Sequence, residues 1–537
     1  MIHTAMNIHS ILEETEGVNN WPPRAEDLSI QQCRSTVPTK LFNFLAWCTG
    51  TSQDFLTSER VDVPSAVENR LLSVCQDLIF LSSRGRKVTP KHLSLGMAVR
   101  HLTGSSSLIG LLNGLGHCIS HSSVLEHDTA LAQQQLHSDG LPPGFCQEVF
   151  TTLVWDNNDF GEETLSGKGT THNTNGIIIQ RNTGDEASTA DNLSTAVAIT
   201  KSKQRTLTTP PSNIIEYHGR PRHGPAPSGS DADCMFQNQD RVIDVPLTKD
   251  LAFWMCKTVQ VEEGNVTLPA WTGFNQQLSG NIIQPVSKIG YLLVIDASPT
   301  EKSTINTVLS TSVDIANKLR LQSVVLNMDL AIYSKAQEIR WQNEEYTKRL
   351  ILRLGEFHTA MSFLSAIGKR FRDAGLEDIM IESGILAQGS VNGVMSGHHY
   401  NRSVRCHKLV AEAMHRLRFN EFLDSLTEEE HLPVIASLLD LRDSYPHSFI
   451  DAVNTEEMKQ LQQKYTDHIE RCCESNVNYA FWSSYLNMVQ LLLLFIRGTR
   501  EGDWHLHLAA IRQMLPWYFA YGKSIIHVIF QSICRKC

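Results

Sequence analysis

The chain of 537 residues is long enough for two to four domains, so the size of the hydrophobic core does not limit its fold. A hydrophobic fraction of 41% and a charged fraction of 19% are typical of soluble globular proteins. The formal net charge of −10 argues against a chain built mainly to coat nucleic acid, although it is compatible with a local basic face.

The twelve cysteines are scattered along the chain, which suits a reducing compartment better than a disulfide framework. The first ten residues lack the pattern of a signal peptide. The longest mostly apolar run, 488–496, is about half of the roughly 20 residues that a membrane helix needs. We therefore expect no membrane segment and a location in the nucleus or the cytoplasm.

Two predicted regions precede the first strand. Residues 1–37 are polar with little periodicity and are predicted to form a flexible leader, whereas 38–140 carries apolar clusters at helical spacing. Within that region, 105–135 has the outline of a helix-turn-helix: a short helix, a glycine-containing turn and a second helix. The second helix carries Glu126 and Asp128 but no lysine or arginine, so an ordinary helical corner is preferred over a DNA-contacting unit.

Residues 147–375 are predicted to form an α/β core. Short runs rich in apolar and β-branched residues predict five strands, at 150–155, 176–179, 291–295, 323–328 and 349–354. The first two are expected to pair as an antiparallel hairpin, and the last three alternate with helices, which indicates a largely parallel sheet. Three strands followed by alternating helix and strand is the order of the ribonuclease H fold, in which the first and fourth strands are neighbours.

Asp156 and Asp329 follow the first and fourth predicted strands, so this topology would bring them together. Two carboxylates at one edge of a sheet are hard oxygen ligands suited to Mg²⁺ or Mn²⁺. Such metals can activate water or a 3′-hydroxyl in phosphodiester transfer. The alternative is that each aspartate only caps the helix that follows it.

A third carboxylate is less clearly marked. Glu356 directly follows the fifth strand, and Glu501 is a candidate if residues 376–520 are an insertion. The histidines and the cysteine that follow the core match no common zinc motif and are expected not to bind a metal; they are His358, His398, His399, Cys406 and His407.

Two further regions complete the predicted organisation. Residues 182–245 are rich in Ser, Thr, Asn, Pro and Gly, and we expect a disordered insertion within the core. From 376 to 537 the apolar spacing is almost entirely helical, and the stripes of aromatic and aliphatic residues are typical of a packed core.

Several segments resemble a family of transposable-element proteins found in animal genomes. They are WDNND at 155–159, LSGKGTTH at 165–172, IDASPT at 295–300, DLAIYSKA at 329–336, LGEFH at 354–358, GHHYNR at 397–402 and REGDWHLHL at 500–508. The resemblance implies kinship with cut-and-paste transposases that have a DDE/D ribonuclease H core and a large helical insertion before the last acid. It also implies that the sequence after 525 departs from the family, so the region 376–537 is expected to be truncated and the metal site incomplete.

We therefore predict an α-rich protein with an α/β ribonuclease H-like core, built on a mixed five-stranded sheet, and large all-α regions. The predicted function is that of a transposase that hydrolyses and joins DNA, with Asp156, Asp329 and Glu356 as catalytic residues and the two aspartates as metal ligands. DNA is the expected partner, and assembly into a homo-oligomer is left open. The alternatives are a non-catalytic DNA- or protein-binding relic of a transposase and an α-rich interaction scaffold.

Overall fold

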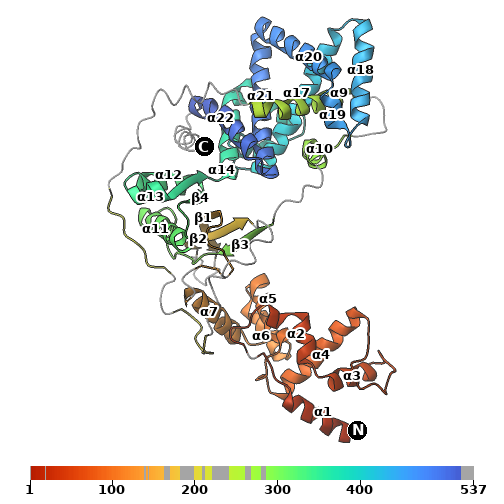
Figure 1. Cartoon of the computed structure of the whole chain (residues 1–537), viewed down its shortest axis with the longest axis vertical. Coiled ribbons are helices and arrows are strands. Elements are labelled where there is room, and N and C mark those ends of the chain that lie inside the picture. The colour runs from red at the N-terminus through yellow and green to blue at the C-terminus, as the bar shows by residue number, and fades with distance from the viewer. Residues whose placement is uncertain are drawn as a thin grey trace.

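The structure of the chain is a computed structural model. It describes residues 2–18, 20–137, 141–142, 144–161, 170–181, 199–207, 212–219, 241–259, 268–279 and 286–521. Along these residues the molecule is elongated, with N-terminal helices at one end, a β-sheet in the middle and a second group of helices at the other end (Figure 1).

The N-terminal end is built from helices alone. They are α1 (Ile2–Glu14), η1 (Glu26–Leu28), α2 (Ile30–Thr36), α3 (Thr39–Cys48), α4 (Ser65–Ser82), α5 (Pro90–Thr103), α6 (Ser106–Gly114) and α7 (His121–His137). The prediction of a flexible leader over 1–37 is therefore wrong for α1 and α2. Leu12 of α1 is buried in a cluster with Leu41 and Phe42 of α3. The ammonium group of Lys87 also donates to the carbonyl oxygens of Leu12 and Glu13, which satisfies acceptors that the end of α1 would leave unpaired.

Helices α6 and α7 form the corner that the pattern at 105–135 predicts. Gly116 adopts a φ of 81° in the turn, a conformation that favours glycine. The hydroxyl of Ser120 then accepts a hydrogen bond from the backbone amide of Ser123 at 3.1 Å, which caps the start of α7. The DNA-contacting role of this corner stays a prediction.

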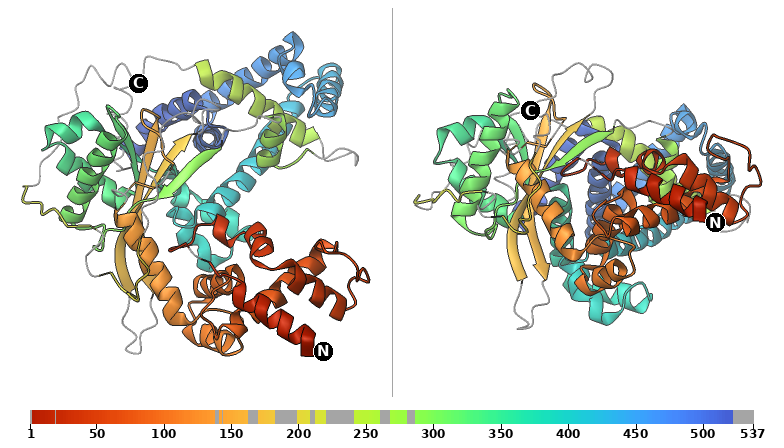
Figure 2. Two further views of the ribbon diagram at one scale, coloured as in Figure 1. Left: turned by 60° about the horizontal axis from the view of Figure 1, so that its bottom comes forward. Right: turned by 90° about the horizontal axis from the view of Figure 1, so that it is seen from below.

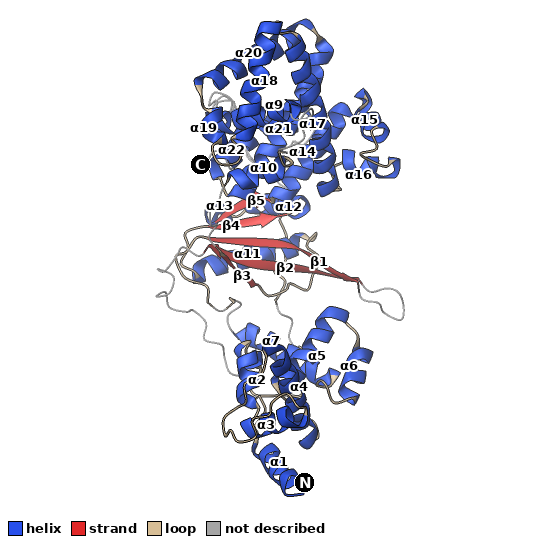
Figure 3. Cartoon of the chain, turned by 90° about the vertical axis from the view of Figure 1, so that its right-hand side faces the viewer, coloured by secondary structure: helices blue, strands red, loops and turns tan. Residues whose placement is uncertain are grey.

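Five strands form one mixed sheet in the order β3-β2-β1-β4-β5, which confirms the predicted sheet (Figure 3). The strands are β1 (Thr151–Gly161), β2 (Thr170–Arg181), β3 (Ser287–Tyr291), β4 (Val324–Met328) and β5 (Leu350–Leu354). Strands β1, β2 and β3 pair with one another in antiparallel fashion, whereas β4 is parallel to both β1 and β5.

The third strand differs from its prediction. The apolar run 291–295 is expected to be a strand, but β3 covers Ser287–Tyr291. After it, the amide of Leu292 still donates to the carbonyl of Gly176 at 2.8 Å, and the next pairing is a bridge between Ile295 and Thr174. Leu292 and Ile295 are 5% and 1% exposed, respectively. The run is therefore apolar because these side chains fill the core, and not because it continues the ladder.

One face of the sheet is covered by α11 (Lys302–Lys318), α12 (Leu330–Arg340) and α13 (Glu344–Arg349), and the C-terminal helices lie on the other side (Figure 2). Trp155 of β1 points into the first layer, where its indole nitrogen donates to the hydroxyl of Ser312 on α11 at 3.2 Å. A buried tryptophan with its polar atom satisfied fixes which face of β1 turns inward.

The other end of the molecule is a group of packed helices. They are α9 (Asp244–Val259), α10 (Trp271–Leu278), α14 (Glu356–Phe371), α15 (Leu376–Glu382), α16 (Val391–Met395), α17 (Tyr400–Asp424), α18 (Glu428–Asp443), α19 (Phe449–Val453), α20 (Glu456–Ser475), α21 (Val477–Glu501) and α22 (Trp504–Ala520). Helices α9 and α10 lie between β2 and β3 in the chain but pack in this group, as the parallel rings of Trp254 and His415 at 4.9 Å illustrate.

Most of the insertion predicted for 182–245 lies outside the described residues. The described parts 199–207 and 212–219 have no regular secondary structure. The backbone amides of Ile215 and Tyr217 nevertheless donate to side chains of α11, at 2.8 and 3.1 Å. The segment 212–219 therefore runs along the surface of that helix.

Helix α21 is the one described helix that is long and apolar enough to cross a membrane by length and composition alone. In the structure, 61% of its most apolar window is buried inside the protein. Leu494 and Tyr485, for example, are fully buried in the main hydrophobic cluster. Packing within the protein thus accounts for the apolar character of α21.

Candidate metal centre

The carboxyl ends of β1 and β4 lie side by side. The parallel register between the two strands ends at the pair Trp155 and Met328. Asp156 and Asp329 are the next residue on each strand, so the sheet brings the two predicted acids to neighbouring positions, although 172 residues separate them in the sequence. The two acids are neighbours because β1 and β4 are adjacent in the strand order and run parallel.

The alternation of side chains places both aspartates on the same face of the sheet. Leu153 and Trp155 are buried on the face covered by α11, so Asp156 belongs to the opposite face together with Thr152. The same alternation along β4 assigns Asp329 to the face of Val325, the register partner of Thr152.

Strand β1 does not end at Asp156 as predicted. It continues to Gly161, and Asp156 remains opposite Asn175 in the antiparallel ladder with β2. Hydrogen bonds to β2 satisfy the backbone beyond the end of β4, which is why the polar residues after Trp155 can stay extended. Asp156 is exposed, and its Oδ1 accepts a hydrogen bond from the amide of Asn157 at 2.8 Å.

Asp329 has a structural task as well as a position at the sheet edge. Its Oδ1 accepts from the backbone amide of Ile332 at 2.7 Å, so the residue is the N-cap of α12. Among the described residues, no hydrogen bond reaches its Oδ2. Helix capping therefore fixes the direction of this carboxylate and leaves one oxygen for another partner.

Glu356 lies at the same edge but is already paired. It is the first residue of α14, and the amide of the preceding Gly355 donates to the carbonyl of Met328 at 2.9 Å, which aligns the ends of β4 and β5. Its carboxylate forms an ion pair of 2.6 Å with Arg353, whose guanidinium lies 4.8 Å from the centre of the Trp504 ring. This contact neutralises the carboxylate that was predicted as the third ligand.

The same face of the sheet borders a cavity of about 650 Å³ near the amino ends of β1 and β4, where Thr152 and Val325 line it, and the corner between α21 and α22 closes its other side. Arg181, Arg353 and Glu356 line it, together with His507 of α22. Burial and, to a smaller extent, the guanidinium of Arg353 lower the pKa of His507 to about 4. Asp156 and Asp329 are not among the residues that line this cavity, and within it the charge of Arg353 is paired with that of Glu356.

Glu501, the alternative third acid, faces a different cavity of about 620 Å³ between α9, α10 and α21. Its carboxylate accepts from Arg497 at 2.9 Å and from the hydroxyl of Ser279 at 3.1 Å. The structure thus does not bring Glu501 to the edge where Asp156 and Asp329 meet.

The donor chemistry at that edge fits a hard divalent cation with two protein ligands. Mg²⁺ commonly takes one or two carboxylates and completes its coordination with water and the phosphate groups of a substrate. Asp156 and Asp329 supply such a pair. A complete protein cage would require a third carboxylate, and both Glu356 and Glu501 are held by arginines.

Among the described residues, a single group of three metal-ligating side chains has all its ligand atoms within 4.8 Å of one another, namely Glu421, His468 and Cys472. The pattern of residues in the sequence did not predict this group. His468 and Cys472 are four residues apart on α20, a spacing that would have been a usable signal, but Glu421 comes from another helix.

Comparison with known proteins gives one match. Residues 270–527 match the family model of a domain of unknown function, DUF8702. This range contains β3, β4 and β5 with Asp329 and Glu356, but it begins after β1 and Asp156. No curated protein matches the chain, and no solved structure matches it either.

Proposed function

We propose that the sheet and the helices around it are a ribonuclease H-like core of a transposase-like protein, which hydrolyses DNA phosphodiester bonds and transfers DNA strands. The observation that carries the proposal is the register of β1 and β4, which makes Asp156 and Asp329 neighbours on one face. The strand order 3-2-1-4-5, with β2 alone running against the other strands, supports it because this is the arrangement of ribonuclease H folds.

In this proposal, Asp156 and Asp329 hold Mg²⁺ or Mn²⁺. A divalent cation bound there would activate water or a 3′-hydroxyl for attack and would stabilise the leaving oxygen. The protein's contribution is positioning: the amide of Ile332 fixes one oxygen of Asp329, and the sheet fixes the backbone of Asp156. Arg181, which lines the cavity on the same face of the sheet, would supply positive charge to a DNA strand that extends over this cavity.

A second candidate is a DNA-binding relic of the same architecture that has lost catalysis. The ion pair between Glu356 and Arg353 favours it, because a neutralised third carboxylate leaves the metal with two protein ligands. Both candidates predict DNA binding that weakens with salt, and they differ in cleavage.

Nicking of supercoiled plasmid DNA in the presence of Mn²⁺ tests the proposal. We expect the full chain to nick the plasmid, and Asp156→Asn and Asp329→Asn each to lower the rate by at least about a hundredfold, as loss of a direct metal ligand should cost more than loss of its supporting contacts. Asp314→Asn is a matched control because Asp314 is exposed on α11, which covers the opposite face of the sheet.

Salt-sensitive DNA binding without nicking by any of these proteins would favour the relic. Equal nicking by the wild type and both aspartate variants would exclude the edge of β1 and β4 as the site of the chemistry. Absence of both nicking and DNA binding would leave the α-rich interaction scaffold.

A further inference from the structure

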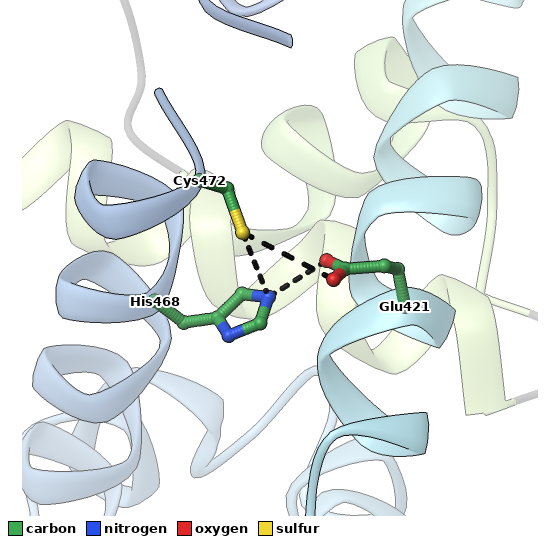
Figure 4. Close-up of side chains that lie close together, drawn as sticks. All are labelled: Glu421, His468 and Cys472. Carbon is green, nitrogen blue, oxygen red and sulfur yellow. Dashed lines mark hydrogen bonds and ion pairs between the residues drawn. The ribbon is translucent and has the colours of Figure 1, made fainter. Parts of the chain in front are cut away.

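Three side chains from two helices converge away from the sheet, among the C-terminal helices (Figure 4). His468 and Cys472 lie one turn apart on α20, and Glu421 faces them from α17. The Nε2 atom of His468 is 2.7 Å from Oε2 of Glu421 and 3.5 Å from the sulfur of Cys472, and the sulfur is 4.0 Å from Oε1 of Glu421. One nitrogen, one sulfur and one oxygen thus point at a common centre.

The surroundings combine a rigid side and an open side. The His468 side chain is 10% exposed, whereas that of Glu421 is 49% exposed. Phe422 packs against the imidazole with ring centres 5.4 Å apart, which fixes the ring. A ligand could therefore enter from the side of Glu421 without opening the helical core.

The arrangement of the group favours a cation, because the sulfur of Cys472 and a carboxylate oxygen of Glu421 lie 4.0 Å apart. A thiolate and a carboxylate that face each other repel, and a bound cation would reverse that repulsion.

We propose that Glu421, His468 and Cys472 form a zinc site with three protein ligands and one position for water. Imidazole nitrogen, thiolate and carboxylate are the ligand set of Zn²⁺, a borderline-soft ion, and two ligands four residues apart on one helix are a common way to hold it. A hard cation such as Mg²⁺ would not select the cysteine and the histidine.

The distances identify the atoms that must move. With zinc bonds of about 2.3 Å to sulfur and about 2.0 to 2.2 Å to nitrogen and oxygen, tetrahedral ligands lie roughly 3.4 to 3.6 Å apart. The separation of 3.5 Å between nitrogen and sulfur already fits. The contact of 2.7 Å between His468 and Glu421 is a hydrogen bond. On binding, the metal replaces the proton of this hydrogen bond and the proton of the thiol. The half-exposed Glu421 side chain shifts outward to reach the longer separation.

Cobalt substitution tests the site in the full chain, because Co²⁺ occupies zinc sites and its absorption reports a thiolate ligand and tetrahedral geometry. The protein is stripped with a chelator, kept reduced with a phosphine and titrated with Co²⁺, which is then displaced with Zn²⁺. We expect a sulfur-to-cobalt charge-transfer band and tetrahedral ligand-field bands at one equivalent, and displacement of both by Zn²⁺.

Three variants and one matched control locate the ligands. We expect Cys472→Ser to abolish the charge-transfer band, and His468→Gln and Glu421→Gln to weaken Co²⁺ binding at least tenfold. Cys473→Ser should retain the full spectrum, because this adjacent thiol lies outside the group. Glu421→Gln keeps a side chain that can hydrogen-bond His468 at a half-exposed position, so it tests the ligand without disturbing the core.

Binding of the same amount of Co²⁺ with the same spectrum by the wild type and Cys472→Ser would overturn the proposal, as would a wild-type spectrum without a thiolate band. Loss of the band in Cys473→Ser but not in Cys472→Ser would also overturn it. Because the assay does not involve DNA, its outcome is independent of the activity proposed for Asp156 and Asp329.

Discussion

His407 is completely buried in α17, where its Nδ1 lies 2.9 Å from the hydroxyl of Tyr485. Burial lowers the pKa of His407 to about 4 and raises that of Tyr485 well above its ordinary value, so a neutral imidazole is hydrogen-bonded to a neutral phenol. The folded protein therefore excludes a proton that the unfolded chain accepts at a pKa near 6.5.

This difference predicts acid sensitivity with a defined sign. Above pH 6.5 both states are neutral at this residue and its contribution to stability is fully present. As the pH falls from 6.5 towards 4, the unfolded chain binds the extra proton, so the free energy of unfolding decreases, by about 3 kcal/mol for a pKa lowered from 6.5 to about 4. Urea unfolding at several pH values between 7.5 and 5 gives the free energy of unfolding as a function of pH. For His407→Gln this free energy should change less steeply with pH than for the wild type, by a slope that corresponds to about one proton.

His505 provides the control for that measurement. It lies on α22 with an exposed side chain, so His505→Gln should leave the pH slope unchanged. Identical slopes for the wild type and His407→Gln would mean that the buried imidazole is not the group that excludes the proton.

At the scale of helices, α14 and α16 approach each other through a glycine. A Cβ atom added at Gly368 would lie well inside van der Waals contact with the backbone carbonyl of Met395. Alanine normally favours a helix interior over glycine by about 1 kcal/mol. Here a backbone atom cannot rotate away, so the clash should dominate.

We therefore expect Gly368→Ala to destabilise the protein by about 1 to 3 kcal/mol, the usual cost of overpacking, which thermal unfolding would detect. Gly389→Ala is a suitable comparison, because a Cβ atom there meets nothing within 4 Å. An unchanged melting temperature for Gly368→Ala would indicate that the two helices can separate at little cost.

The elements differ in how far the sequence predicts them, for physical reasons. The predicted bounds of β4 and β5 agree with the observed ones to within one residue. This agreement is possible because each strand is a short β-branched or leucine-rich run, and a helix cap directly after the run marks where the strand ends. The bounds of β3 could not be predicted in this way, since Leu292 and Ile295 are apolar for burial outside the ladder. The position of α9 among the C-terminal helices depends on contacts with residues more than 150 positions away, such as His415.

The candidate sites show the same division. The adjacency of Asp156 and Asp329 follows from the order of the predicted strands, so the sequence suffices to predict it. The pairing of Glu356 with Arg353 depends on side-chain conformation at the start of α14, which a pattern of residue types does not specify. The group around His468 depends on the packing of α20 against α17, for which the sequence offers only the spacing of two of its members.

At the scale of the whole molecule, the buried side chains form separate clusters. One continuous cluster extends from the sheet through the C-terminal helices, whereas the N-terminal helices bury their own residues in two smaller clusters. Parts that share a core unfold together, and parts with separate cores have no such coupling. Calorimetry should therefore resolve two transitions, one for α1–α7 and one for the remainder.

Single core substitutions assign the two transitions. Leu41 on α3 and Leu326 on β4 are both fully buried, and leucine-to-alanine changes in a core cost about 2 to 5 kcal/mol. We expect Leu41→Ala to lower the midpoint of the α1–α7 transition only, and Leu326→Ala to lower the midpoint of the other transition only. If either substitution shifted both midpoints equally, the two ends of the molecule would form one cooperative unit. Removing α6 and α7 would then also destabilise the sheet that carries Asp156 and Asp329, so such a deletion could not test a DNA-contacting role for these helices.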